Sequence, residues 1–199
     1  MYKRQVSEGH PDKVADQISD SLLDNFLVQD SESKVACETL VTTGLTVLSG
    51  EVKTNSYVDV QEVARETIRK IGYTKSEYKF DADSCGVISA IHEQSSDIRQ
   101  GVVEGEGLHK EQGAGDQGMM FGYATNETTS YIPLELDLSH QILVELSQIR
   151  KTKKEMLYLR PDSKSQVTIE YTADPVPPKI RSLVLSPQQE DCDSEEMMG

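Results

Sequence analysis

The chain has 199 residues, enough for one full domain and part of another. With 34 acidic against 20 basic residues its formal net charge is −14, which disfavours nucleic acid and anionic membrane surfaces as partners. No apolar run approaches the roughly 18 residues that a membrane span needs, and no apolar signal segment opens the chain. Its three cysteines (Cys37, Cys85 and Cys192) are too scattered for a disulfide framework or a zinc site. We therefore predict a cytoplasmic protein with buried thiols at Cys37 and Cys85.

The first predicted elements are a helix and a pair of strands. Apolar side chains recur every four residues over 10–29, which is typical of an amphipathic helix with Pro11 in its first turn. The residues with this spacing are Val14, Ile18, Leu22 and Phe26. Alternating residues over 35–41 and a second β-rich run at 45–48 then predict two paired strands.

A second helix and a further strand follow. The apolar face of residues 60–71 predicts a helix that Gly72 ends. Residues 86–91, Gly-Val-Ile-Ser-Ala-Ile, resemble a buried strand. Helices and strands are thus mixed in the first half of the chain, which indicates an α+β class.

The second half begins with a loop and continues as another α+β unit. Six of the chain's 13 glycines lie between Gly101 and Gly118, where no apolar period survives, so we predict a long mobile loop. A third helix is indicated by Leu138, Ile142, Leu146 and Ile149. Strands are predicted at 166–172 and 179–185.

The domain organisation follows from these elements. We expect an amino-terminal domain over 1–94, a mobile active-site loop over 95–118 and an incomplete central domain over 119–187. Residues 188–199 carry five acidic and no basic side chains, so we predict a disordered acidic tail.

The segment from Gly9 to Lys13, Gly-His-Pro-Asp-Lys, lies at the start of the first predicted helix. Free backbone N–H groups at a helix start favour anions, so a phosphate could bind there. His10 could donate to a phosphate oxygen, and Asp12 could hold Mg²⁺ together with substrate phosphates. Pro11 and Asp12 are also ordinary first-turn residues, and that reading stands beside the functional one.

Other candidates are weaker when taken singly. The chain has no GxxxxGK[ST] phosphate loop, and the glycines of 113–118 are compatible with close backbone approach to a ligand or with a plain linker. Glu38 and Glu51 lie on neighbouring predicted strands, where solvated charges are common. Gln94 follows a predicted strand, and the acid and base of 159–166 could belong to a turn made by Pro-Asp-Ser.

Four motifs taken together are far more specific. They are Val-Ser-Glu-Gly-His-Pro-Asp-Lys at 6–13, Ala-Cys-Glu-Thr at 36–39, Gly-Ala-Gly-Asp-Gln-Gly with the following ten residues at 113–128, and Leu-Arg-Pro-Asp-Ser-Lys-Ser-Gln-Val at 159–167. In order and spacing they resemble the S-adenosylmethionine synthetase family, also called methionine adenosyltransferases. Members of that family make S-adenosylmethionine from methionine and ATP, and they hydrolyse the released triphosphate to pyrophosphate and phosphate.

The resemblance implies roles for individual residues. By position, His10 contacts the triphosphate, Asp12 binds Mg²⁺ and Glu38 binds K⁺. Asp162 and Lys164 contact ATP. Because a neutral thioether needs no base to attack, such a site works by alignment and by stabilising charge on the leaving triphosphate.

The methionine side of the site is implied in the same way. Glu51 and Gln94 contact methionine, Asp116 belongs to a catalytic motif, and residues 94–112 correspond to the family's mobile gate. Closure of that gate would exclude water, so we expect this loop to become ordered when ligands bind.

The family fold has three similar α+β domains related by pseudo-threefold symmetry, in homodimers that often pair into homotetramers with active sites between subunits. The resemblance covers the first domain and most of the second, with residues 1–5 in place of the usual leading strand and Gln188-Gln189 in place of a Gln-His pair. Because later cationic residues and the third domain are absent from the sequence, a second reading is a fragment that only binds nucleotide and Mg²⁺ or associates with full-length subunits. We then expect no adenosyltransferase activity from these 199 residues alone, and either poor solubility or mixed oligomers.

Overall fold

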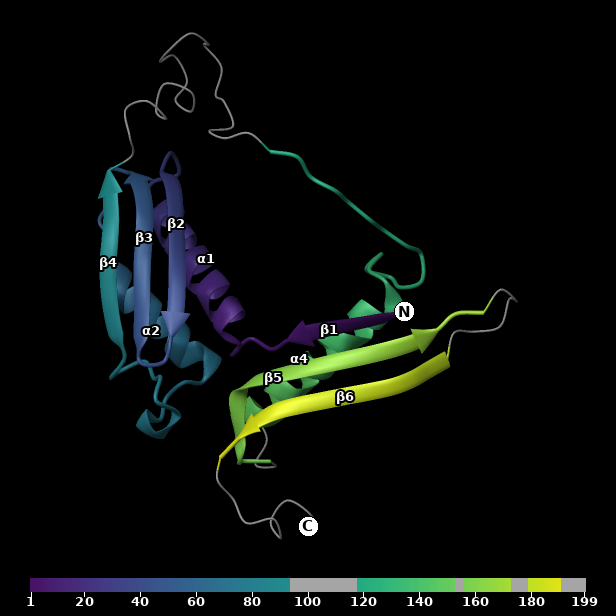
Figure 1. The fold of residues 1–199 in the computed structure, drawn as a ribbon. Coiled ribbons are helices and arrows are strands. Elements are labelled where there is room, and N and C mark those ends of the chain that lie inside the picture. The colour runs from purple at the N-terminus through teal and green to yellow at the C-terminus, as the bar shows by residue number, and fades with distance from the viewer. Residues whose placement is uncertain (94–117, 153–155, 173–178, 191–199) are drawn as a thin grey trace.

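The computed structural model describes residues 1–93, 118–152, 156–172 and 179–190. They form two three-stranded sheets, each with helical cover on one face, as Figure 1 shows. One sheet has the strand order β2-β3-β4 and the other has the order β1-β5-β6. The expected α+β class is therefore confirmed. In the parts of the chain described, no helix is long and apolar enough to cross a membrane.

The first sheet and its helices form one unit from a continuous stretch of chain. In order, its elements are α1 (Pro11–Gln29), β2 (Lys34–Thr42), β3 (Leu45–Lys53), α2 (Val60–Ile71), the 3₁₀ helix η1 (Ser76–Tyr78) and β4 (Gly86–Glu93). Strands β2 and β3 are antiparallel, whereas β4 pairs with β3 in parallel after the crossover through α2. Both helices pack together over one face of this sheet.

The predicted helices and strands of this unit are confirmed. His10 caps α1, and Gly72, at φ 114°, ends α2 in the left-handed conformation that glycine adopts without strain. The α1 stripe that predicted the helix is buried: Val14, Ile18, Leu22 and Phe26. Val14, Ile18 and Leu22 meet Leu48 of β3 and Ile68 of α2 in the main apolar core.

The cysteine prediction is only partly met. Cys85 is buried, but Cys37 on β2 is half-buried. Burial raises the pKa of both thiols. Neither side chain therefore has the lowered pKa of a reactive nucleophile.

The strand expected over residues 86–91 is confirmed, but the expectation that it is buried is wrong. The strand β4 forms, but only Val87 and Ile91 are half-buried, and Ile88 is 54% exposed. The helices cover one face of the sheet, and Ile88 lies on the opposite face. A continuous apolar run suggests cover on both faces, which the described residues do not supply here.

The second sheet combines the two ends of the described chain. Its elements are β1 (Tyr2–Val6), α4 (Leu134–Thr152), β5 (Leu159–Glu170) and β6 (Lys179–Gln189). Strand β1 is antiparallel to β5, with Tyr2 opposite Thr168 and Val6 opposite Lys164. The expectation that residues 1–5 replace a leading strand is therefore wrong, because a short polar segment gives no local signal for so distant a partner.

Strands β5 and β6 are longer than the sequence predicted. Residues 161–163, which were compatible with a turn, lie inside β5, where burial alternates from Leu159 onward. The pairing with β6 is irregular between Leu159 and Ser163, so this part of the strand departs from a regular ladder. Strand β6 extends into the expected acidic tail, which does not begin at 188; residues 191–199 lie outside the described residues.

Candidate functional site

The Gly9–Lys13 segment covers the end of the connection from β1 and the first turn of α1. His10 is the residue before the helix, and its Nδ1 accepts a hydrogen bond from the Asp12 backbone N–H at 3.2 Å. A neutral imidazole that accepts at Nδ1 carries its proton on Nε2, which leaves Nε2–H available to donate to an anion. The ring of His10 thus caps α1, and Pro11 and Asp12 occupy the first turn of this helix.

The carboxylate of Asp12 lies in the first turn of α1 and is 84% exposed. Its Oδ2 is 3.7 Å from Nδ1 of His10, too far for a hydrogen bond. An exposed carboxylate beside a helix start fits a hard cation that also binds phosphate oxygens. Among the described residues, no three His, Cys, Asp or Glu side chains gather into a metal-binding group.

Gly9 brings this segment against β5. A Cβ atom at Gly9 would lie 2.3 Å from the backbone carbon of Pro161, so only glycine allows the two backbones to approach this closely. The Tyr73 hydroxyl, from the segment after α2, donates to the Gly9 carbonyl oxygen at 2.5 Å. Burial and the nearby Asp162 carboxylate raise the pKa of Tyr73, so its hydroxyl keeps this proton.

Asp162 enters the same region from β5. Together with Gly9 and Pro11 it lines a cavity of about 260 Å³. This cavity lies between the first unit and a second unit, which consists of the sheet β1-β5-β6 and α4. Its Oδ1 is buried and has no hydrogen-bond partner in the described protein. Such an atom is costly to bury unless something donates to it, so the cavity fits a ligand that carries a donor group.

Lys164 lies two residues further along β5. Alternation along a strand puts Asp162 and Lys164 on the same face of the sheet, and Lys164 is directly opposite Val6 of β1. The structure thus brings the helix start at Gly9 and Pro11 together with Asp162, whereas His10, Asp12 and Lys164 are not among the residues that line this cavity. The meeting of the helix start with Asp162 depends on β1, which supplies both the pairing with β5 and the entry into α1.

The other expected site residues lie elsewhere. Glu38 on β2 and Glu51 on β3 are diagonal neighbours, since Glu38 is opposite Ser49 and Glu51 is opposite Ala36. Both lie on the face of the sheet that α1 and α2 do not cover. They share that face with one another, and they do not line the cavity beside Asp162.

Two expected residues cannot be placed. Gln94 and Asp116, together with the gate predicted over 94–112, lie outside the described residues. The segment that follows, from Gly118, is described and carries exposed side chains; Phe121 is 90% exposed.

Sequence reasoning missed several residues that hold the site. Ser7, Glu8 and Tyr73 each contact another element beside the helix start, and so does Arg150 on α4. Ser7 and Glu8 belong to the motif that carried the resemblance, which was a usable signal. Arg150 gave none beyond being a basic residue in the last turn of a helix.

Comparisons with known proteins assign both parts of this architecture to one class. Residues 2–96 match the amino-terminal domain of S-adenosylmethionine synthetase, and residues 111–198 match the central domain. The chain belongs to the S-adenosylmethionine synthetase family, as its motifs predicted.

Its relatives include the S-adenosylmethionine synthases of Flavobacterium johnsoniae and Cytophaga hutchinsonii. These are 66% and 65% identical to it over 193 residues, which is 97% of this chain and 46% of each relative. The Bacteroides fragilis S-adenosylmethionine synthase is 64% identical over 186 residues, 94% of this chain and 43% of the relative. The chain thus spans about half the length of the curated relatives it matches.

Proposed function

We propose that the protein carries the ATP-binding part of an adenosyltransferase that makes S-adenosylmethionine from methionine and ATP. The observation that carries this proposal is the cavity in which the helix start at Gly9 and Pro11 meets Asp162, whose buried Oδ1 has no hydrogen-bond partner in the described protein. Family membership supports it, because the relatives are named as synthases of this product.

In the proposed reaction the methionine sulfur donates a lone pair to C5′ of ATP. The bond from C5′ to the triphosphate oxygen breaks, and the triphosphate leaves with that electron pair. Water then hydrolyses triphosphate to pyrophosphate and phosphate. The nucleophile loses no proton before it attacks, so the protein must mainly align the reactants and stabilise negative charge on the leaving group.

The described residues suit this work. Nε2–H of His10 donates to a triphosphate oxygen, while Asp162 and Lys164 bind ATP from β5. Asp12 holds Mg²⁺, which supplies positive charge beside the phosphates when it is bound. The positive end of α1 adds to this anion site.

Methionine and K⁺ belong to the uncovered sheet face in this proposal. Glu38 binds K⁺ and Glu51 contacts methionine, with Gln94, Asp116 and the gate over 94–112 completing the site. Support comes from the exposed apolar side chains on the same face, Leu40 at 58% and Ile88 at 54%, which suit cover by a second subunit. We therefore propose a homodimer or homotetramer, in which the partner closes this face.

The cellular setting is part of the same proposal. Free thiols at Cys37 and Cys85 suit the reducing cytoplasm, where a soluble metabolic enzyme would work. The net charge of −14 argues against nucleic acid and anionic membranes as partners.

A second candidate is a binding module that takes up Mg²⁺ and nucleotide, or associates with full-length subunits, without turnover. It rests on the same cavity beside Asp162, which would accept a ligand with a donor group whether or not turnover follows. Incubation with methionine, ATP, Mg²⁺ and K⁺, with S-adenosylmethionine measured by mass spectrometry, separates the two. Multiple turnovers support the adenosyltransferase, whereas calorimetric binding of Mg–ATP without product supports the binding module. If neither binding nor product is detected, both candidate functions are contradicted.

A further inference from the structure

The residues immediately before His10 form a tight turn that is held from three directions. The His10 backbone N–H donates to the Ser7 carbonyl oxygen at 3.1 Å, which makes Glu8 and Gly9 the central residues of the turn. At one end, Ser7 donates its hydroxyl to the Pro161 carbonyl oxygen and accepts the Ser163 N–H, both at 2.8 Å. These bonds attach the start of the turn to β5.

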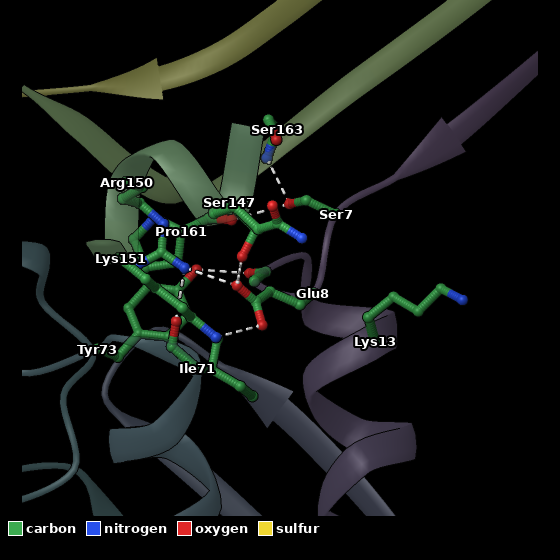
Figure 2. Close-up of polar contacts among 12 residues, drawn as sticks. Ser7, Glu8, Lys13, Ile71, Tyr73, Ser147, Arg150, Lys151, Pro161 and Ser163 are labelled. Atoms are coloured by element: carbon green, nitrogen blue, oxygen red, sulfur yellow. Dashed lines mark hydrogen bonds and ion pairs between the residues drawn. The ribbon is translucent and has the colours of Figure 1, made fainter. Parts of the chain in front are cut away.

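Glu8 is attached to a different element, helix α4. Its Oε1 accepts from the Arg150 guanidinium at 2.7 Å and from the Ser147 hydroxyl, and its Oε2 accepts from the Lys151 ammonium at 2.7 Å. Figure 2 shows these three donors converging on one carboxylate, while Lys13 on α1 points away from it. The Glu8 carboxylate thus binds two cations, whereas an ordinary surface ion pair has one. The side chain of Arg150 is only 12% exposed.

Arg150 also reaches a third element. Its guanidinium donates to the carbonyl oxygen of Ile71, the last residue of α2, at 2.7 Å. A Cβ atom at Gly72 would lie 2.2 Å from Nη1 of Arg150, so the end of α2 is shaped to admit this side chain. One guanidinium therefore ties the turn before His10 to the carboxyl ends of both α2 and α4.

We propose that Glu8 and Arg150 are positioning residues for the anion site, fixing the turn so that His10 and Asp12 face the triphosphate. The proposal rests on the proposed function. Since Glu8 precedes His10 by two residues, rotation of the turn would move the imidazole and the Asp12 carboxylate together. A static turn pre-organises both groups before the ligand arrives.

The test compares variants of this chain that break the contact between Glu8 and Arg150 with one that breaks a different contact between the two units. Glu8→Gln keeps the size and removes the charge, and Arg150→Lys keeps the charge while shortening the reach to Ile71. Lys75→Gln is the matched control, because the Lys75–Glu190 ion pair of 2.6 Å also joins the first unit to the second but does not touch the turn. Thermal unfolding of all variants separates local from global loosening.

Two readouts are needed, and the first requires no ligand. Exchange of the Asp12 amide and the ¹⁵N spectrum of the His10 ring report whether Nδ1 still accepts its hydrogen bond. We expect faster exchange and an averaged tautomer signal in Glu8→Gln, a smaller change in Arg150→Lys, and wild-type behaviour in Lys75→Gln. Wild-type exchange and ring signals in Glu8→Gln would overturn the proposal.

The second readout is calorimetric binding of inorganic tripolyphosphate with Mg²⁺, the group that the proposed reaction releases. Glu8→Gln should weaken it by about 10- to 100-fold, as loss of an outer support does at metal sites. Tighter binding would mean that Arg150 and Lys151 had been released to the anion, and it would overturn the proposal. If tripolyphosphate fails to bind even to the unchanged chain, the proposed function fails, and the exchange result alone decides whether Glu8 positions His10.

Discussion

The two sheets of the protein differ in what covers them. The sheet β2-β3-β4 has α1 and α2 over one face, whereas β1-β5-β6 has α4 alone among the described helices. Leu48 in β3 is fully buried, but Leu183 in β6 is 51% exposed, although it is paired with the fully buried Val167. Strand pairing satisfies the backbone, and only a layer packed on top removes the side chain from water. The same contrast yields four predictions.

The largest effect is expected in the core of the first unit. Leu22→Ala removes a fully buried side chain of α1 and should lower the free energy of unfolding by about 2–5 kcal/mol. Leu183→Ala makes the same change at a half-exposed position of β6 and should cost less than about 1 kcal/mol. Urea unfolding followed by circular dichroism measures both. Equal losses would contradict the difference in cover between the sheets.

The next effect concerns the contact between the two units. Gly9→Ala introduces a methyl group 2.3 Å from the Pro161 backbone, and neither backbone can give way cheaply. We expect a loss of about 1–3 kcal/mol, together with weaker binding of Mg–tripolyphosphate. Gly122→Ala is the control, since nothing lies within 4 Å of a Cβ atom there. A Gly9→Ala protein as stable as this control would show that the close approach is not required.

A smaller change in stability, but a clear change in function, is expected at the start of α1. Asp12→Asn keeps the shape of an 84% exposed side chain and removes its charge, so unfolding should change by less than about 1 kcal/mol. The Mg²⁺ dependence of ATP or tripolyphosphate binding should fall sharply, because a hard anionic ligand is lost. Asp16→Asn, one turn further along α1, should leave both unchanged. Unaltered Mg²⁺ dependence in Asp12→Asn would remove Asp12 from the metal site.

The smallest effect is a pH dependence at the end of β6. Hydrogen bonds from Lys75 and then Tyr78 lower the pKa of Glu190 below its ordinary value of 4.5. Because the folded-state pKa is the lower one, this contribution is fully present above about pH 4.5 and is lost as the pH falls through that folded-state value. The pair is partly exposed, so Glu190→Gln should cost less than about 1 kcal/mol at pH 7.

Urea midpoints of the wild type and Glu190→Gln, measured from pH 3 to pH 7, test the sign of this dependence. The two curves should converge as the pH falls below 4.5. A gap that widens toward acid pH would mean that the carboxylate is not stabilised by Lys75 in the folded chain.

Local sequence predicted the first unit well because each of its signals is short. The stripe from Val14 to Phe26 repeats within one helix, and Gly72 ends α2 by its own backbone freedom. The motif at Gly9–Lys13 was likewise visible, since it lies at a helix start. The resemblance that named the family rested on such short motifs, and the family models confirm it.

The sequence by itself determined the helices, most of the strands and the family. Tertiary structure alone decided which distant residues share the cavity, and which charges meet at the turn before His10. The pairing of Val6 with Lys164, and the hydrogen bond that Arg150 donates to Glu8 across 142 positions, leave no periodic trace in either segment. A residue's own neighbours in the chain set its local conformation, whereas a contact between remote segments depends on the whole chain folding and on the free energy of burying both partners.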